Sequence, residues 1–224
     1  MLIVVLDSAT PAITAGLVDV GPDRVTVVAE QVAVDPRAHG ELLAPEVDAV
    51  LRAGEARPRD LAAVVAGTGP GPFTGLRVGL VTAAALSQTL GIPAYGVCSL
   101  DALGLAAARG GAEGEALVAT DARRKEIYWA VYRDGKRLTE PAVGRPADLD
   151  LPDGVAVAVG DGALRYADVL GLPVRDEPRY PPVAALAEMA ADRVRAGAPG
   201  EPLTPLYLRR PDAAQPGVRK PVLR

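Results

Sequence analysis

The chain has 224 residues, which is long enough for one large domain or two small ones. Hydrophobic residues make up 49% of it and charged residues 23%, a composition that excludes intrinsic disorder. The formal net charge of −4 argues against a surface that binds nucleic acid over its whole extent.

The N-terminal run MLIVVLD has no basic region and too short an apolar core for a signal peptide. No window approaches 18 uninterrupted apolar residues, so we expect no membrane span. Cys98 is the single cysteine, which excludes an intramolecular disulfide and suits a reducing compartment. A cytoplasmic protein without membrane contact is the expectation.

Strands and helices alternate along the first hundred residues. Short β-rich runs predict strands at 2–6, 13–18, 24–34, 61–66 and 92–97. Apolar residues at helical spacing, together with glycine and proline stop signals, predict helices at 39–53, 74–90 and 99–109.

The second half repeats the layout of the first. ALVATD–ARRK–EIYWAVY (116–132) follows the order of LIVVLD–SATP–AITAGLV (2–18), so that Asp7 and Asp121 occupy matching places. VVAGTG (64–69) likewise matches VAVGDG (157–162). These echoes predict an internal duplication and an α/β fold with mixed sheets. We expect an N-terminal lobe at 1–110, a trimmed second lobe at 111–206 and a basic tail at 207–224.

The glycine-rich run AGTGPGPFTGLRVGL (66–80) stands where many α/β proteins hold a phosphate. It matches neither the Walker A pattern nor the dinucleotide pattern, and Pro70 and Pro72 have no N–H to donate to an anion. Arg77 lies in the first turn of the following helix, where a cation opposes the helix dipole. Arg77 either meets an acidic group of a ligand or partner or lies on the surface.

One side of helix 74–90 carries small residues. Gly75, Gly79, Ala83 and Ala84 would let another helix approach closely. The neighbouring helix could belong to a partner or to the same lobe.

Asp7 and Asp121 each end a strand at a sheet edge, where carboxylates that bind metal or phosphate often lie. Turn formation is the favoured explanation for both residues, because an Asp side chain accepts hydrogen bonds from nearby backbone N–H groups. With Gly160 and Gly162 they make a weak candidate nucleotide site. His39 and Cys98 are each alone, so the sequence predicts no metal site and no catalytic constellation.

The tail from Tyr207 to Arg224 carries five basic residues against Asp212 alone. Such a segment is either solvated or contacts an RNA backbone or an acidic partner.

Four motifs together resemble the TsaB family, also called YeaZ: LDSAT, AGTGPGPFTGLRVGL, TDARRKEIYWAVY and PLYLRRPDA. They stand in the family's order and cover essentially the full length. The resemblance implies a duplicated actin-like/Hsp70-like ATPase (ASKHA) fold. It also implies a non-catalytic subunit of the complex that transfers the threonylcarbamoyl group to adenosine 37 of ANN-decoding tRNAs.

In the resembling family the partners are the paralogue TsaD and the ATPase TsaE, with tRNA reached through the complex, and a homodimer also forms. The resemblance implies no cofactor bound to the chain alone, with ATP or ADP restricted to the complex. The H-x-x-x-H metal pair of TsaD is replaced here by Ser99 and Leu103. An actin-fold ATPase or phosphotransferase that uses Asp7 and Asp121 is the alternative.

By the same resemblance, the partner would bind helices 39–53 and 74–90 of the first lobe. The residues expected at this interface are Leu42, Leu43, Gly75, Arg77, Val78, Gly79, Thr82 and Ala83.

Overall fold

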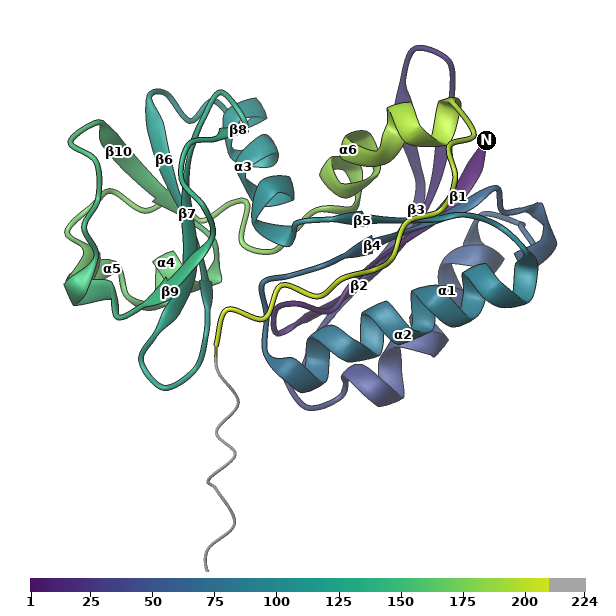
Figure 1. Ribbon diagram of the computed structural model, residues 1–224, viewed down its shortest axis with the longest axis horizontal. Helices are drawn as coiled ribbons and strands as arrows, with labels where there is room; N and C mark the ends of the chain where they lie inside the picture. The colour runs from purple at the N-terminus through teal and green to yellow at the C-terminus, as the bar shows by residue number, and fades with distance from the viewer. Residues whose placement is uncertain (210–224) are drawn as a thin grey trace, which may run out of the picture.

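The computed structural model describes residues 1–209, which form two lobes that lie side by side (Figure 1). Each lobe is built on one mixed β-sheet of five strands, which confirms the predicted α/β class. Residues 210–224, most of the predicted basic tail, lie outside the described part of the chain. Within residues 1–209 no helix has the length and apolar character needed to cross a membrane.

The first sheet has the strand order β3-β2-β1-β4-β5. β2 runs antiparallel to β1 and β3, whereas β4 runs parallel to β1, and β5 parallel to β4. Alternate side chains of β1 enter two different apolar clusters, because successive residues of a strand point to opposite faces. The five strands are β1 (Leu2–Asp7), β2 (Ala12–Val20), β3 (Val25–Val34), β4 (Ala63–Gly67) and β5 (Ala94–Val97).

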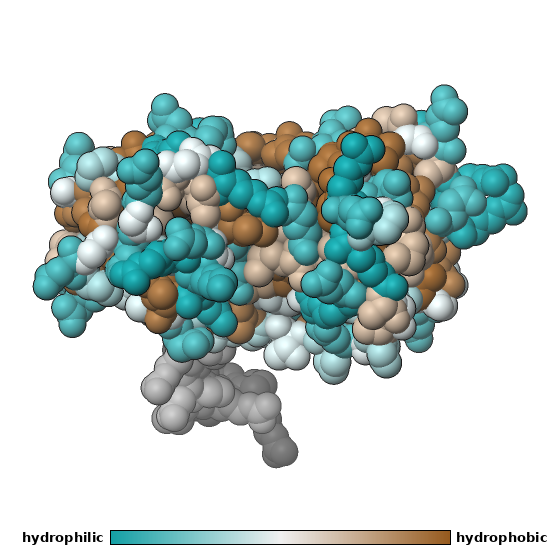
Figure 2. All heavy atoms as spheres, turned by 90° about the horizontal axis from the view of Figure 1, so that it is seen from above, coloured by the Kyte–Doolittle hydropathy of each residue, from teal (hydrophilic) through white to brown (hydrophobic). Residues whose placement is uncertain are grey.

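Three helices cover the two faces of this sheet. α1 (His39–Ala53) and α2 (Phe73–Leu90) lie on one face and α6 (Val183–Arg195) on the other (Figure 1). α1 has the predicted bounds, and α2 begins one residue earlier than predicted. A 3-10 turn, η1 (Pro58–Asp60), precedes β4. On the α6 side of the molecule, hydrophilic and hydrophobic side chains are interspersed over both lobes (Figure 2).

The second sheet has the order β10-β6-β7-β8, with β9 paired to β7. β6 and β7 are antiparallel like β1 and β2, and β10 runs parallel to β6 as β4 does to β1. Asp7 and Asp121 therefore end equivalent strands, as the repeat predicted. The elements are β6 (Glu115–Asp121), β7 (Ile127–Arg133), β8 (Lys136–Arg137), β9 (Ala142–Gly144), η2 (Pro146–Asp148), β10 (Val155–Val159), α4 (Asp161–Arg165) and α5 (Ala167–Leu170).

The two lobes exchange one helix each. This exchange corrects the expectation that every helix of segments 1–110 and 111–206 packs on the sheet of its own segment. α3 (Ser99–Arg109), from the first segment, packs on the second sheet, where Leu100 and Leu103 meet Val118 and Tyr132. α6, from the second segment, packs on the first sheet. An apolar helix stripe shows that a helix covers a sheet but not which sheet, so the sequence pattern alone did not reveal the exchange.

A strap formed by residues 198–209 runs from the first lobe to the second (Figure 1). The Glu201 N–H donates to Ala94 O at 2.9 Å, and the Leu206 N–H donates to Thr68 O at 2.9 Å. At the far end the Arg209 guanidinium donates to Ala122 O at 2.9 Å and pairs with Glu126. The first three residues of the predicted tail therefore belong to this strap.

The packing of α3 on the second sheet is testable at Gly104. A Cβ at this position would overlap the ring of Tyr132, which is fully buried. We expect Gly104→Ala to lower the free energy of unfolding by about 1–3 kcal/mol, because the core has no room for the added methyl group. Chemical denaturation followed by circular dichroism measures the change.

Gly40→Ala is the matched control, since Gly40 is also helical and a Cβ there meets nothing within 4 Å. It should be neutral or stabilise by up to about 1 kcal/mol through helix propensity. Equal effects of the two substitutions would contradict the described packing of α3.

Candidate functional site

The glycine-rich loop packs against the turn between β1 and β2. A Cβ at Gly71 would overlap the backbone of Ala9, and one at Gly75 would lie 3.0 Å from Ser8 O. Ser8 Oγ donates to Gly75 O at 2.8 Å and accepts from the Gly79 N–H at 2.9 Å. The glycines of this loop therefore permit a close contact within the lobe, and the loop does not form an open phosphate cradle.

Asp7 is buried beneath the same loop. Its Oδ2 accepts from the Ser99 hydroxyl at 2.6 Å, and its Oδ1 accepts from the Ala9 N–H at 3.0 Å. A Cβ at Gly67 would overlap this carboxylate. Burial raises the pKa of Asp7 to about 6, although both hydrogen bonds act in the opposite direction. Asp7 thus connects the end of β1 to the start of α3.

The side of α2 with small residues faces inward, which corrects part of the expected partner interface. Gly75, Gly79 and Ala83 are buried, whereas Ala84 is exposed, and a Cβ at Gly79 would overlap Ser8 Oγ. Leu43 of α1 is buried in the core. The remaining expected residues are the half-buried Leu42, Val78 and Thr82 and the exposed Arg77. Of the two explanations for the small residues, the structure supports close packing within the lobe.

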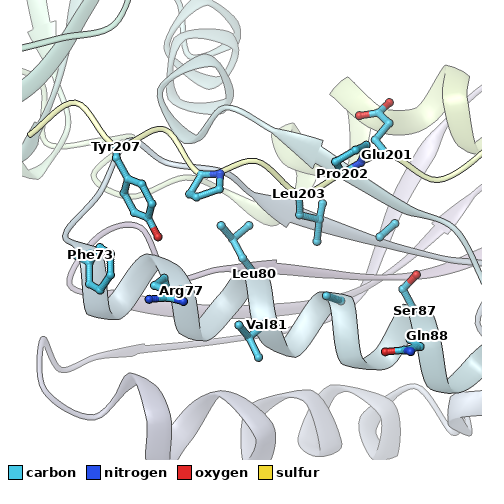
Figure 3. A pocket seen from close by; sticks show the side chains of 13 residues that line it. Phe73, Arg77, Leu80, Val81, Ser87, Gln88, Glu201, Pro202, Leu203 and Tyr207 are labelled. Carbon is cyan, nitrogen blue, oxygen red and sulfur yellow. The ribbon is translucent and has the colours of Figure 1, made fainter.

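The outer side of α2 forms a groove with the strap (Figure 3). The groove has a volume of about 680 Å³, and apolar side chains from both segments line it. Phe73 is 56% exposed, Val81 62% and Tyr207 43%, so they present a large apolar area to solvent. Sequence reasoning missed all three; Phe73 and Val81 could have been noticed as large apolar residues outside the buried stripe of α2.

Arg77 lies at one end of this groove. Its guanidinium carbon is 4.8 Å from the centroid of the Phe73 ring, and the Phe73 and Tyr207 rings are 5.2 Å apart. A cation over a ring face is attracted by the ring quadrupole. Arg77 therefore stays at the surface, stacked on an aromatic side chain.

A second recess of about 400 Å³ lies between the lobes. Asp121 and Asp161 are buried at its base, and Asp161 Oδ1 accepts from the Asp121 N–H at 3.3 Å. Burial raises the pKa of Asp161 to about 6. Asp7 does not line this recess, so the structure does not bring Asp7 and Asp121 into one site. The recess is lined by Pro11, Pro36, Asp121, Arg123, Asp161, Leu164, Arg165, Arg179 and Tyr180.

Gly160 and Gly162 position the chain behind this recess. A Cβ at Gly160 would overlap Ala119 O, and one at Gly162 would lie 2.6 Å from the carbonyl carbon of Thr120. Gly160 also has φ 102°, a conformation that favours glycine. Both glycines let the turn after β10 approach β6. Close packing therefore explains the Gly-x-Gly pattern at 160–162.

The remaining candidate residues have structural contacts. His39 Nε2 lies 2.8 Å from Thr10 O, and burial raises the pKa of the Cys98 thiol to about 12. Ser99 donates to Asp7, and Leu103 is part of the core. Among residues 1–209, no group of three or more His, Cys, Asp or Glu side chains is arranged to hold a metal ion.

Comparison with known proteins agrees with this architecture. The family model for TsaD, tRNA N6-adenosine threonylcarbamoyltransferase, matches residues 26–195. The solved structure of YeaZ from Pseudomonas aeruginosa superimposes with a TM-score of 0.75 and 26% identity, covering 92% of this chain and 99% of that one. The two mixed sheets and the similarity to YeaZ together define an actin-like α/β protein of the ASKHA type, as the sequence predicted.

Proteins that are similar in sequence narrow the assignment to a family. Proteins of Mycobacterium tuberculosis and Mycobacterium leprae are each 48% identical over 212 residues. The match covers 93% of the first but 56% of the second, so the chain spans about half the length of the M. leprae relative. Escherichia coli TsaB, named a tRNA threonylcarbamoyladenosine biosynthesis protein, is 33% identical over 133 residues, 59% of this chain and 55% of that protein. The chain belongs to the TsaB (YeaZ) family.

The raised pKa of Asp7 predicts a pH-dependent stability. The folded protein holds this proton more tightly than the unfolded chain, so the contribution of Asp7 to stability is fully present below a pH of about 4 and is lost as the pH rises through about 6. A shift of about two pKa units corresponds to roughly 3 kcal/mol. As the pH rises from about 4 to about 7, we expect the free energy of unfolding of the wild type to fall by roughly 3 kcal/mol more than that of Asp7→Asn.

Denaturant titrations at several pH values measure this difference. Asp23→Asn, at an exposed site, should keep the wild-type pH dependence. Wild-type pH dependence in Asp7→Asn as well would show that the burial of Asp7 is not its cause.

Proposed function

We propose that this chain is a non-catalytic subunit of the complex that transfers the threonylcarbamoyl group to adenosine 37 of ANN-decoding tRNAs. Membership of the TsaB family carries this proposal, because family relatives are named for threonylcarbamoyladenosine biosynthesis. A TsaD-like paralogue is the direct partner, and the complex includes a TsaE-like ATPase and the tRNA. ATP or ADP binds only within the complex, not to this chain alone.

The contacts of Asp7 and Ser99 support a structural role over the alternative ATPase. An ATPase that used Asp7 and Asp121 would need both carboxylates at one ligand. Asp7 instead accepts hydrogen bonds from Ser99 and Ala9 beneath the glycine loop, away from the recess at Asp121. Its carboxylate maintains the connection between β1 and α3.

The outer side of α2 is the proposed docking face, with the neighbouring part of α1. Exposed aromatic residues and arginine are enriched at protein interfaces, and Phe73, Arg77 and Tyr207 meet this description. Val81 adds an exposed branched side chain in the same groove. A partner helix or loop laid into the groove would bury these side chains. A homodimer would use the same surface when the paralogue is absent.

Val81→Arg tests the docking face. The substitution places a charge in the apolar groove, so we expect the affinity for the TsaD-like paralogue to fall by about tenfold or more. Biolayer interferometry with the immobilised paralogue measures the change, and analytical ultracentrifugation of the chain alone reports on the homodimer.

Val34→Arg is the control, since Val34 is a 57% exposed valine on β3. It should leave the affinity unchanged. Gly79→Arg is unsuitable because the added side chain would displace Ser8 and disturb the fold. Undiminished binding by correctly folded Val81→Arg would rule out this groove as the docking face.

A further inference from the structure

The first sheet ends in two edge strands, of which one is covered by the strap. At β5 the strap lies along the edge, and the Glu201 N–H donates to Ala94 O at 2.9 Å. At the opposite edge, within residues 1–209, the backbone of β3 hydrogen-bonds to β2 and to no other element. β3 is ten residues long. Its outer edge therefore presents a row of backbone N–H and C=O groups that can pair with another strand.

Exposed valines lie on the same strand. Val28, Val32 and Val34 are 45%, 48% and 57% exposed, whereas the exposed apolar side chains beside α2 belong to the groove already described. Soluble proteins usually protect an edge strand with charged residues, proline or a bulge. β3 has one bulge, which leaves Val28 without a partner residue in β2, and one charged residue, Glu30, which accepts from the Val183 N–H of the same lobe at 3.5 Å. Neither feature covers the valines.

The two ends of β3 carry opposite charges. Arg24 immediately precedes the strand and Asp35 immediately follows it, and both residues are exposed. If two β3 strands pair antiparallel with their ends aligned, Arg24 of each copy faces Asp35 of the other. Opposite charges across an antiparallel pair stabilise it, and like charges destabilise it. A second copy of this chain therefore complements the edge in charge as well as in apolar character.

We propose that two copies of this chain associate through β3. The two strands pair antiparallel about a two-fold axis and join the first sheets of both copies into one sheet. Main-chain hydrogen bonds supply affinity, as in other cases of strand addition. Val32 and Val34 of one copy lie beside the start of β3 in the other copy and lose exposed area. The two-fold pairing uses up both open edges, so the assembly closes as a dimer.

This surface goes beyond the proposed function, because β3 contributes no residue to the groove beside α2. A dimer through β3 is therefore distinct from a homodimer through the groove. Val81→Arg places a charge in the groove and leaves β3 unchanged, so this variant of the full chain is the suitable background in which to examine association through β3 alone.

Analytical ultracentrifugation of the Val81→Arg chain over a range of concentrations tests the proposal. We expect a reversible dimer. Adding either Arg24→Asp or Asp35→Arg should raise its dissociation constant by about tenfold or more, because each change replaces two attractive contacts of the symmetric dimer by two repulsive ones. Adding both changes together should restore the dimer, since the charges are then exchanged across the same pair. Circular dichroism and thermal unfolding verify that each variant folds.

Arg59→Asp, at an exposed arginine of η1, is the matched control and should leave the dissociation constant unchanged. A monomer at every concentration, equal weakening by Arg59→Asp, or no recovery in the double variant would overturn the proposal. Protection of the β3 amides from hydrogen exchange only after a TsaD-like paralogue is added would overturn it as well and would assign the edge to that partner. Paralogue affinity is measured separately, so failure here leaves the proposed function standing.

Discussion

Asp7 and Ser8, at the end of the first strand, hold together segments that are far apart in the sequence. Ser8 Oγ bridges Gly75 O and the Gly79 N–H, which sets the position of α2. Asp7 accepts from Ser99, whose Oγ in turn accepts from the Gly69 N–H at 3.2 Å. Since α3 starts at Ser99 and continues onto the second sheet, this buried network also fixes where the chain enters the second lobe. Buried polar groups that are fully hydrogen-bonded specify one arrangement, and the helices on either side follow from it.

The exchange of α3 and α6 and the strap then determine how the lobes face each other. Leu105 and Ala106 of α3 also pack against the apolar cluster that contains α6, so separating the lobes would expose apolar surface. The strap is fastened to the first lobe by Arg193, which pairs with Glu201 and donates to Gly96 O. It reaches the second lobe through Arg209. Within residues 1–209 the chain therefore crosses between the lobes three times, at α3, at α6 and along the strap. These crossings set the separation between the walls of the recess that contains Asp121.

Most of the fold was predictable from the sequence, because the elements of the first lobe have clean local signals. The periodicity of Leu43 and Val47 identified α1, and Gly91 marked the end of α2. The repeat located Asp7 and Asp121 at equivalent strand ends. The exchange of helices and the strap were not predictable, since they depend on which apolar surfaces meet in three dimensions. For the candidate site the sequence indicated small residues of α2 as a partner surface, whereas Gly75, Gly79 and Ala83 are buried within the lobe. Small residues permit close approach and do not say whose backbone approaches.

The glycine loop illustrates the same limit in chemical terms. Glycine is required wherever backbone comes close to another group, and here that group is Ser8 and Ala9 of the same lobe, in place of a phosphate. Arg123 and Arg179 line the separate recess between the lobes, in segments without this glycine run.

A smaller recess of about 160 Å³ connects the two surfaces, since both Arg123 and Phe73 line it. Arg123 therefore lies beside the first turn of α2, which also presents the outer groove. Two ligands that meet at one helix end can influence each other only through a free-energy coupling that is equal in both directions. If partner docking moved Phe73, the affinity of the interlobe recess for any ligand would change by the same factor by which that ligand changes the affinity for the partner. The short path from Arg123 to Phe73 provides a physical route for that coupling, and it passes Ser8 and Gly75, whose buried hydrogen bond holds α2 on the sheet.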